Sequence, residues 1–141
     1  MKHQLNTQIT IEANPEHVWE VFSDFDQYPS WNPFIKSING TLAVGQKFQA
    51  EIGNMKFTPV LLENEPNRKF SWIGRLWFSG IFDGHHMFEL IDNHDGTTTF
   101  KHGESFKGIL VRLMKKKLDS EILQSFQLMN EALRDRCERN S

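Results

Sequence analysis

Two histidines and one glutamate lie in two neighbouring segments whose side chains alternate between polar and apolar. His86 belongs to the first of these segments, and His102 and Glu104 belong to the second. Because alternate side chains of a β-strand share a face, the three polar residues should point to the same side as bulky apolar neighbours. The apolar residues in phase with them are Phe88, Leu90, Phe100 and Phe106. We therefore expect two imidazoles and one carboxylate to face an otherwise aromatic interior.

Such a cluster is compatible with three roles. Histidine titrates near neutral pH and a buried carboxyl group can exchange a proton in the same range, so His102 and Glu104 are candidate catalytic residues. Their acid–base chemistry would suit a dehydration or an aldol-type cyclisation. The same side chains could instead orient the polar head of an apolar ligand, or hydrogen-bond to each other as part of the core. Ligand binding and a structural role are both favoured over catalysis.

The cluster does not have the spacing of a metal site. His86, His102 and Glu104 could supply three ligands, but residues on adjacent strands form no recognised ligand motif. The single cysteine, Cys137, excludes a disulfide within the chain and a site built on paired cysteines. The sequence also lacks a nucleophile constellation, a phosphate-binding glycine loop and a dinucleotide fingerprint. We expect neither a metal nor a cofactor.

Aromatic residues along the chain could form the wall of a ligand site around this cluster. Trp72 is the strongest candidate because its indole combines one N–H donor with a large apolar face. Asn130 is a polar residue at the edge of an apolar helix face, where it could bond a ligand, a strand residue or solvent. The segment Trp77-Phe78-Ser79-Gly80 is expected at the mouth of the pocket or as a lid. The candidate ligand-binding residues are Trp31, Phe34, Phe48, Phe57, Phe70, Trp72, His86, Phe88, His102, Glu104, Phe106, Phe126, Met129 and Asn130.

Strands make up most of the scaffold that must position these residues. Alternation of apolar and polar residues predicts strands at residues 4–13, 34–39, 46–52, 55–64, 68–76, 81–92 and 97–107. Between the first two strands, Asn14-Pro15-Glu16 predicts a helix start, with Asn as the cap and Pro in the first helical position. A second short helical segment at about 25–31 ends before Pro33.

One long helix should complete the chain. After Gly108 the apolar residues recur at spacings of three and four, which is typical of an amphipathic helix. Its first part, 108–117, could be bent or partly separate. Consecutive strands with short turns pair antiparallel, and about seven of them would curl around this helix. We therefore predict one α+β domain over residues 1–141, in which a curved antiparallel sheet, two short helices and the long C-terminal helix enclose a cavity. The apolar positions of this helix are Ile122, Phe126, Met129, Leu133 and Cys137.

This order of elements resembles the SRPBCC superfamily, the helix-grip group that includes START-type lipid-transfer domains and polyketide cyclases/dehydratases. The segments that carry the resemblance are IEANPEHVWEVFSDFDQYPSWNPFI, FDGHHMFELID, TTFKHGESFKG and MNEALRDRCE. The match runs from about Leu5 to Glu138, and the HHxFEL and HGExFxG segments are similar to an uncharacterised bacterial subgroup. The resemblance implies a cavity between the sheet and the last helix, but function must be argued from the site.

Net charge and the distribution of apolar residues exclude some classes of binding partner. The net charge of -2 does not fit a nucleic-acid binder, and the run Lys115-Lys116-Lys117 is best interpreted as a solvated helix start. No apolar stretch has the length of a signal peptide or a membrane span, so a cytoplasmic location without membrane insertion is the default. Our first hypothesis is binding of a small hydrophobic molecule, lipid-like or polyketide-like. The alternatives are a cyclase/dehydratase-type enzyme that uses His102 and Glu104, and a stress-response or chaperone-associated module. The oligomeric state stays open.

Overall fold

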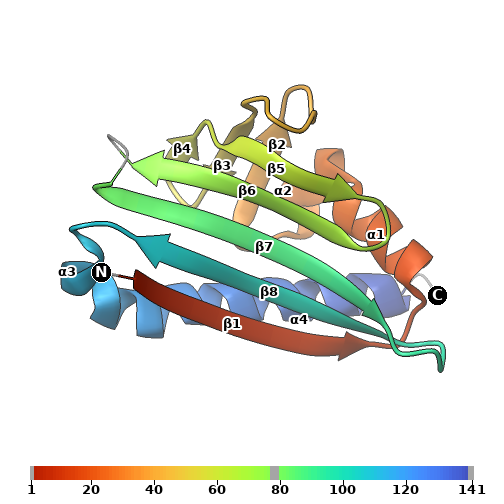
Figure 1. Cartoon of the computed structure of the whole chain (residues 1–141). Coiled ribbons are helices and arrows are strands. Elements are labelled where there is room, and N and C mark those ends of the chain that lie inside the picture. The colour runs from red at the N-terminus through yellow and green to blue at the C-terminus, as the bar shows by residue number, and fades with distance from the viewer. Residues whose placement is uncertain (1, 77–79, 140–141) are drawn as a thin grey trace.

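The computed structural model describes residues 2–76 and 80–139 and shows an α+β architecture (Figure 1). Its first half contains β1 (Lys2–Ile11), α1 (Pro15–Ser23), the 3₁₀ turn η1 (Phe25–Gln27), α2 (Tyr28–Trp31), β2 (Ile35–Asn39), β3 (Gln49–Ile52), β4 (Met55–Phe57) and β5 (Val60–Glu65). Its second half contains β6 (Lys69–Leu76), β7 (Phe82–Asp92), β8 (Thr98–Lys107), α3 (Val111–Lys117), the π-helical turn η2 (Leu118–Ile122) and α4 (Leu123–Arg139).

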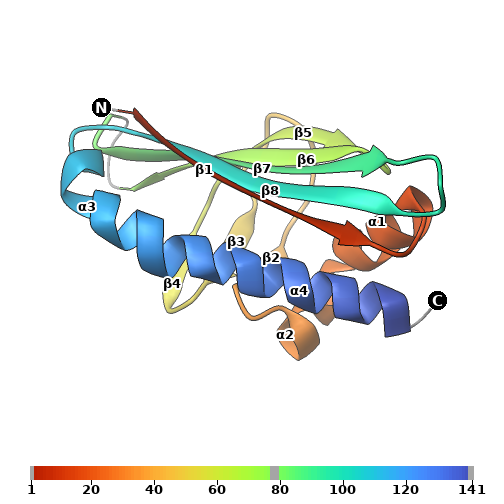
Figure 2. The ribbon, with the colours of Figure 1, turned by 90° about the horizontal axis from the view of Figure 1, so that it is seen from below.

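The larger sheet has five antiparallel strands in the order β1-β8-β7-β6-β5. Its long strands curve, and the C-terminal helix runs along one face of the sheet from α3 to the end of α4 (Figure 2). Over the other face of the sheet, no helix lies among the residues that the structure describes. This arrangement confirms the predicted helix grip, in which a curved antiparallel sheet holds a long C-terminal helix.

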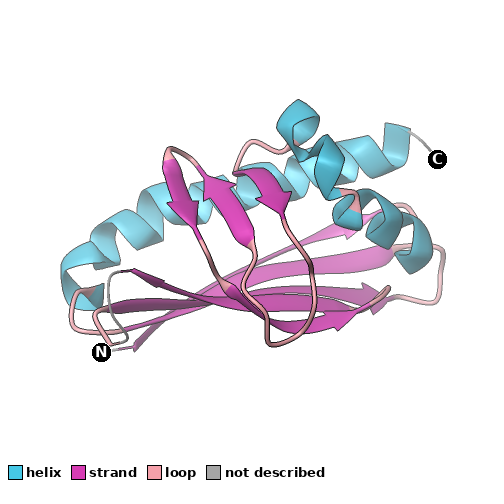
Figure 3. Cartoon of the chain, turned by 90° about the horizontal axis from the view of Figure 1, so that it is seen from above, coloured by secondary structure: helices cyan, strands magenta, loops and turns pink. Residues whose placement is uncertain are grey.

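A smaller sheet, in the order β2-β3-β4, stands off the large sheet on the side of α4 (Figure 3). Backbone hydrogen bonds join the segment that leads into β3 to β5 and the residue before it, including Gly45 N to Leu61 O at 2.8 Å and Phe48 N to Pro59 O at 3.0 Å. The sequence-based count of about seven strands is one short, because the segment predicted as one strand at 55–64 forms both β4 and β5. The break falls at Pro59, which has no N–H to donate to a continuous ladder.

Helix α1 covers one end of the sheet. It begins as the sequence predicts: Pro15 is its first residue, and the Asn14 side chain accepts a hydrogen bond from the backbone N–H of His17 at 2.9 Å. Phe22, on its buried face, packs against the sheet with ring centroids 5.0 Å from Phe88 and 5.8 Å from Phe100. This end of the space between the sheet and α4 is filled by aromatic side chains.

The C-terminal helix is continuous but not uniform. Between α3 and α4 the five residues of η2 adopt π-helical geometry. The buried side chains of α4 are Phe126, Met129, Asn130, Leu133 and Cys137. In the described part of the chain, no helix combines the length and the apolar character that crossing a membrane requires.

Candidate functional site

The candidate site starts from the register of three neighbouring strands. In the pairing of β7 with β8, His86 lies opposite Glu104 and Phe88 lies opposite His102. In the pairing of β6 with β7, Trp72 lies opposite His86. Because directly paired side chains of antiparallel strands share a face, all five side chains lie on the face that α4 covers.

A chain of polar contacts, which we call the polar line, connects five side chains across this face. Glu104 Oε1 lies 3.0 Å from His86 Nδ1, and His86 Nε2 lies 2.7 Å from His102 Nε2. On its other side, His102 Nδ1 lies 2.9 Å from Asn130 Oδ1, and Asn130 Nδ2 donates to Thr7 Oγ1 at 2.8 Å. The Thr7 hydroxyl donates in turn to the backbone carbonyl of His102 at 2.6 Å. Buried polar groups that would each be costly alone are therefore paired with one another.

His102 is the most enclosed member of the polar line. Its ring is fully buried and stacks on Phe126, with ring centroids 4.2 Å apart and an interplanar angle of 15°. Burial, reinforced by the neighbouring His86, holds the pKa of His102 well below the usual 6.5, although the hydrogen bond to Asn130 acts in the opposite direction. His102 is therefore a neutral imidazole near neutral pH.

Of the two residues at this end of the polar line, Glu104 is the more exposed. Its side chain keeps 14% exposure, whereas that of His86 keeps 1%. Gly84 makes room for the carboxylate, because a Cβ atom at this position would collide with Glu104 Oε2. Gly74, which is paired with Gly84 across β6 and β7, has open space where a Cβ would stand.

Glu104 and His86 lie at the wall of a cavity of about 400 Å³ between the large sheet, the small sheet and the C-terminal helix. This volume is within the range of small-molecule sites, which are concave and mostly apolar with a few placed polar groups. The cavity is lined by Pro33, Phe34, Ala50, Ile52, Gly53, Asn54, Met55, Phe57, Pro59, Trp72, Gly74, Arg75, Phe82, Gly84, His86, Glu104, Phe106, Met114, Lys117, Leu118, Ile122 and Ser125.

The structure separates the predicted ligand-binding residues into two groups. Phe34, Phe57, Trp72, His86, Glu104 and Phe106 line the cavity. Phe48, Phe70, Phe88, His102, Phe126, Met129 and Asn130 are buried outside its lining. Trp31 is half-buried beside Tyr28, with ring centroids 5.1 Å apart, and is also outside the lining. Trp77, Phe78 and Ser79, predicted at the mouth or as a lid, are outside the described residues.

The two predicted catalytic residues are not in direct contact through their side chains. His86 lies between them, with a hydrogen bond to His102 and an ion-pair contact to Glu104, so the pair that borders the cavity is His86 with Glu104. Sequence reasoning missed Thr7, although it is in phase with Leu5 on the first strand. It also missed the role of Gly84, whose missing side chain at an inward position was a readable signal.

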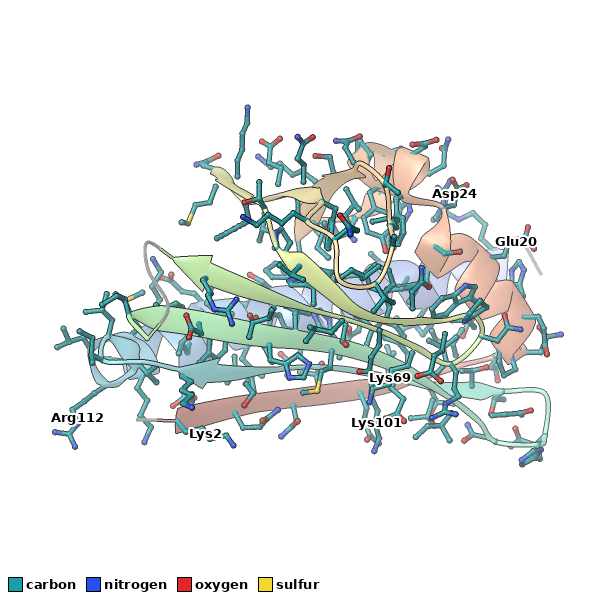
Figure 4. All side chains as sticks on the ribbon, turned by 45° about the horizontal axis from the view of Figure 1, so that its top comes forward. Lys2, Glu20, Asp24, Lys69, Lys101 and Arg112 are labelled. Carbon is teal, nitrogen blue, oxygen red and sulfur yellow. The ribbon has the colours of Figure 1, made fainter. Side chains whose placement is uncertain are left out.

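Among residues 2–76 and 80–139, no three or more of the His, Cys, Asp and Glu side chains are grouped as metal ligands would be. A second hollow, of about 380 Å³, lies on the opposite face of the large sheet. Polar and charged side chains border it, among them Lys69 and Lys101, which Figure 4 shows on the sheet face turned away from α4. It has no apolar enclosure comparable to the cavity.

We compared the sequence and the fold with those of known proteins. The model of a family described as "Polyketide cyclase / dehydrase and lipid transport" matches residues 2–138. A search of curated proteins found no significant match. The fold resembles that of a hypothetical protein from Helicobacter pylori (TM-score 0.81, 13% identity, 96% of this chain and 88% of that one).

Two further solved structures share the fold over nearly the whole chain. One is a START superfamily protein from Mycobacterium smegmatis (TM-score 0.73, 20% identity, 99% of each chain). The other is the Zhui aromatase/cyclase from a Streptomyces species (TM-score 0.76, 13% identity, 99% of this chain and 96% of that one). At these identities the likeness establishes the fold, and the chemistry has to come from the cavity itself.

Proposed function

The chain belongs to the polyketide cyclase / dehydrase and lipid transport family, and from that premise we propose that it binds a small hydrophobic molecule in the cavity. The observation that carries the proposal is a mostly apolar cavity of about 400 Å³, whose described wall carries one carboxylate, Glu104, and two cationic side chains, Arg75 and Lys117. Aromatic and aliphatic side chains would supply the binding free energy through burial of apolar surface. Glu104, backed by His86, would hold the one polar group of the ligand.

Two features favour binding over catalysis. His102, which the sequence pairs with Glu104 for acid–base chemistry, is fully buried and does not border the cavity. His86 does border it, but both of its ring nitrogens are engaged, one with Glu104 and one with His102. Proton transfer by His102 and Glu104 therefore stays a prediction from the sequence, and binding requires no such step.

Filling the cavity tests the proposal. Ala50 is buried and lines the cavity, so Ala50→Phe places a ring in the space that the ligand would occupy. Leu128→Phe is the matched control, because Leu128 is 48% exposed on α4 and outside the lining. We expect calorimetry with 2-naphthol to give a micromolar dissociation constant, on the order of 10–100 μM for such a small ligand. The Ala50→Phe variant should bind at least about tenfold more weakly, which is a loss of roughly 1.4 kcal/mol.

Circular dichroism and thermal unfolding must show that both variants are folded. Leu128→Phe should bind 2-naphthol as the wild type does. Failure of the wild type to bind naphthalene-based molecules, or unchanged binding by a folded Ala50→Phe variant, would overturn the proposed function.

A further inference from the structure

The hydrogen bonds of the polar line have a direction, and its starting point is a backbone carbonyl. The carbonyl oxygen of His102 can only accept, so the Thr7 hydroxyl donates its single proton there, at 2.6 Å. Thr7 Oγ1 must then accept from Asn130 at 2.8 Å, which places the Asn130 NH₂ group toward Thr7. The orientation of the Asn130 amide is fixed by this contact, and its oxygen faces His102.

That amide orientation sets the tautomer of both imidazoles. Asn130 Oδ1 accepts at 2.9 Å from His102, so His102 carries its proton on Nδ1. A neutral His102 then presents a lone pair at Nε2, and His86 must donate from its own Nε2 across the 2.7 Å contact. His86 Nδ1 remains to interact with Glu104 Oε1 at 3.0 Å.

His86 Nδ1 and Glu104 Oε1 form an ion-pair contact at 3.0 Å, and a proton shared by the two groups would lie on either the nitrogen or the oxygen. In the first arrangement Glu104 is a carboxylate, and in the second it is an acid whose proton is on Oε1. In both arrangements Glu104 Oε2 carries no proton and is a hydrogen-bond acceptor. This oxygen lies over Gly84, and it has no hydrogen-bond partner among the described residues.

We infer that the cavity selects molecules that present a hydrogen-bond donor, such as a hydroxyl group, to Glu104 Oε2 over molecules that present only an acceptor. The inference rests on the proposed function and adds the class of ligand. A hydroxyl group satisfies the oxygen, whereas an ether or a ketone oxygen would leave two acceptors facing each other in a mostly apolar space.

Two probes with one apolar body and different head groups test the inference: 2-naphthol and 2-methoxynaphthalene. At pH 7 we expect calorimetry to show 2-naphthol binding about 10- to 100-fold more tightly than 2-methoxynaphthalene. Glu104→Leu should remove the preference, because it takes away the acceptor and leaves an apolar wall.

Glu104→Gln tests the direction of the polar line itself. Because His86 donates from Nε2, its neutral ring accepts at Nδ1, so the Gln amide should turn its NH₂ group to His86 and its oxygen to the cavity. We expect 2-naphthol to remain the tighter ligand in this variant, by a smaller margin than in the wild type. A reversal, with 2-methoxynaphthalene preferred, would show an N–H facing the cavity and would overturn the inference.

The outcomes for the inference and for the proposed function are distinct. If 2-naphthol and 2-methoxynaphthalene bind the wild type equally well and Ala50→Phe blocks both, the ligand class is wrong and the proposed function stands. If neither probe binds the wild type, the proposed function fails and the inference fails with it.

Discussion

The two ends of the space between the large sheet and the C-terminal helix have similar residues and opposite packing. At the packed end, Phe22 of α1 inserts among the rings of Phe70, Phe88 and Phe100, with centroids 5.0 to 5.9 Å apart. At the cavity end, Phe57, Trp72 and Phe106 surround open space. Both ends use the same sheet, the same helix and the same residue type, so an aromatic residue by itself indicates neither core nor cavity.

The elements opposite the sheet make the difference. At the packed end α1 supplies a large side chain that fills the space. At the cavity end the facing elements are α3, η2 and the small sheet, and Gly74 and Gly84 contribute no side chain to the sheet surface. The polar line crosses between the two ends, with fully buried His102 at its centre and Glu104 at the cavity. A hollow therefore forms where the facing elements leave a large side chain out.

Truncating one aromatic residue at each end should give the largest difference between the two ends in the free energy of unfolding. Phe22→Ala removes a fully buried ring from the packed end and should lower the free energy of unfolding by about 3–5 kcal/mol. Phe57→Ala removes a half-buried ring at the cavity, where the wall is already solvent-accessible, and should cost about 1 kcal/mol or less. Urea denaturation measures both values.

If Phe22→Ala does not fold, Phe22→Leu should show a smaller loss in the same direction. Equal losses at Phe22 and Phe57 would mean that the two ends are packed alike.

Substitutions at two paired glycines should distinguish the contribution of the Glu104 carboxylate to ligand affinity from that of the cavity volume. Gly84→Ala puts a methyl group where Glu104 Oε2 lies, so the carboxylate must move, and affinity for 2-naphthol should fall about tenfold or more. Gly74→Ala is the matched control on the paired strand, because its Cβ meets no heavy atom within 4 Å. Calorimetric titration should show only a small change for it. Similar losses in both variants would argue that cavity volume, and not Glu104, determines affinity.

Acidification should lower the free energy of unfolding through His102, the central residue of the polar line. The pKa of His102 is lowered in the folded protein, so the unfolded chain binds its proton more readily. The free energy of unfolding therefore keeps its full value above pH 6.5, where His102 is neutral in both states, and decreases as the pH falls below 6.5. Between pH 7 and pH 5.5 we expect the free energy of unfolding to drop by about 1 kcal/mol from this residue alone.

Two variants isolate the contribution of His102. Replacing it in His102→Gln should remove this part of the pH dependence, whatever the variant's absolute stability. His94→Asn changes an 85% exposed histidine and should leave the slope as it is. An unchanged slope in His102→Gln would contradict the assignment.

The strand alternation was readable from the sequence, and it correctly placed His86, His102 and Glu104 on one face. The register of β7 against β8 could not be predicted, because it depends on the turn between these strands. In the observed register His86 lies opposite Glu104, which places His86 between Glu104 and His102 in the polar line.

The sequence also could not divide the aromatic residues between core and cavity. Phe88 and Phe106 are in equivalent phase on adjacent strands. Phe88 meets Phe22 of α1, whereas Phe106 packs on Phe82 and lines the cavity. The packing partners of each residue come from elements that are distant in the chain, and a local sequence pattern does not identify those elements.

The most direct test of the account is a nitrogen–proton correlation spectrum of the ¹⁵N-labelled protein during titration with 2-naphthol. If the ligand enters the cavity, the indole N–H of Trp72 and the backbone N–H of Gly84 should shift in proportion to bound ligand. The backbone N–H groups of Leu133 and Cys137, which are buried at the packed end, should stay in place. Shifts at Leu133 and Cys137 without shifts at Trp72 and Gly84 would contradict the account.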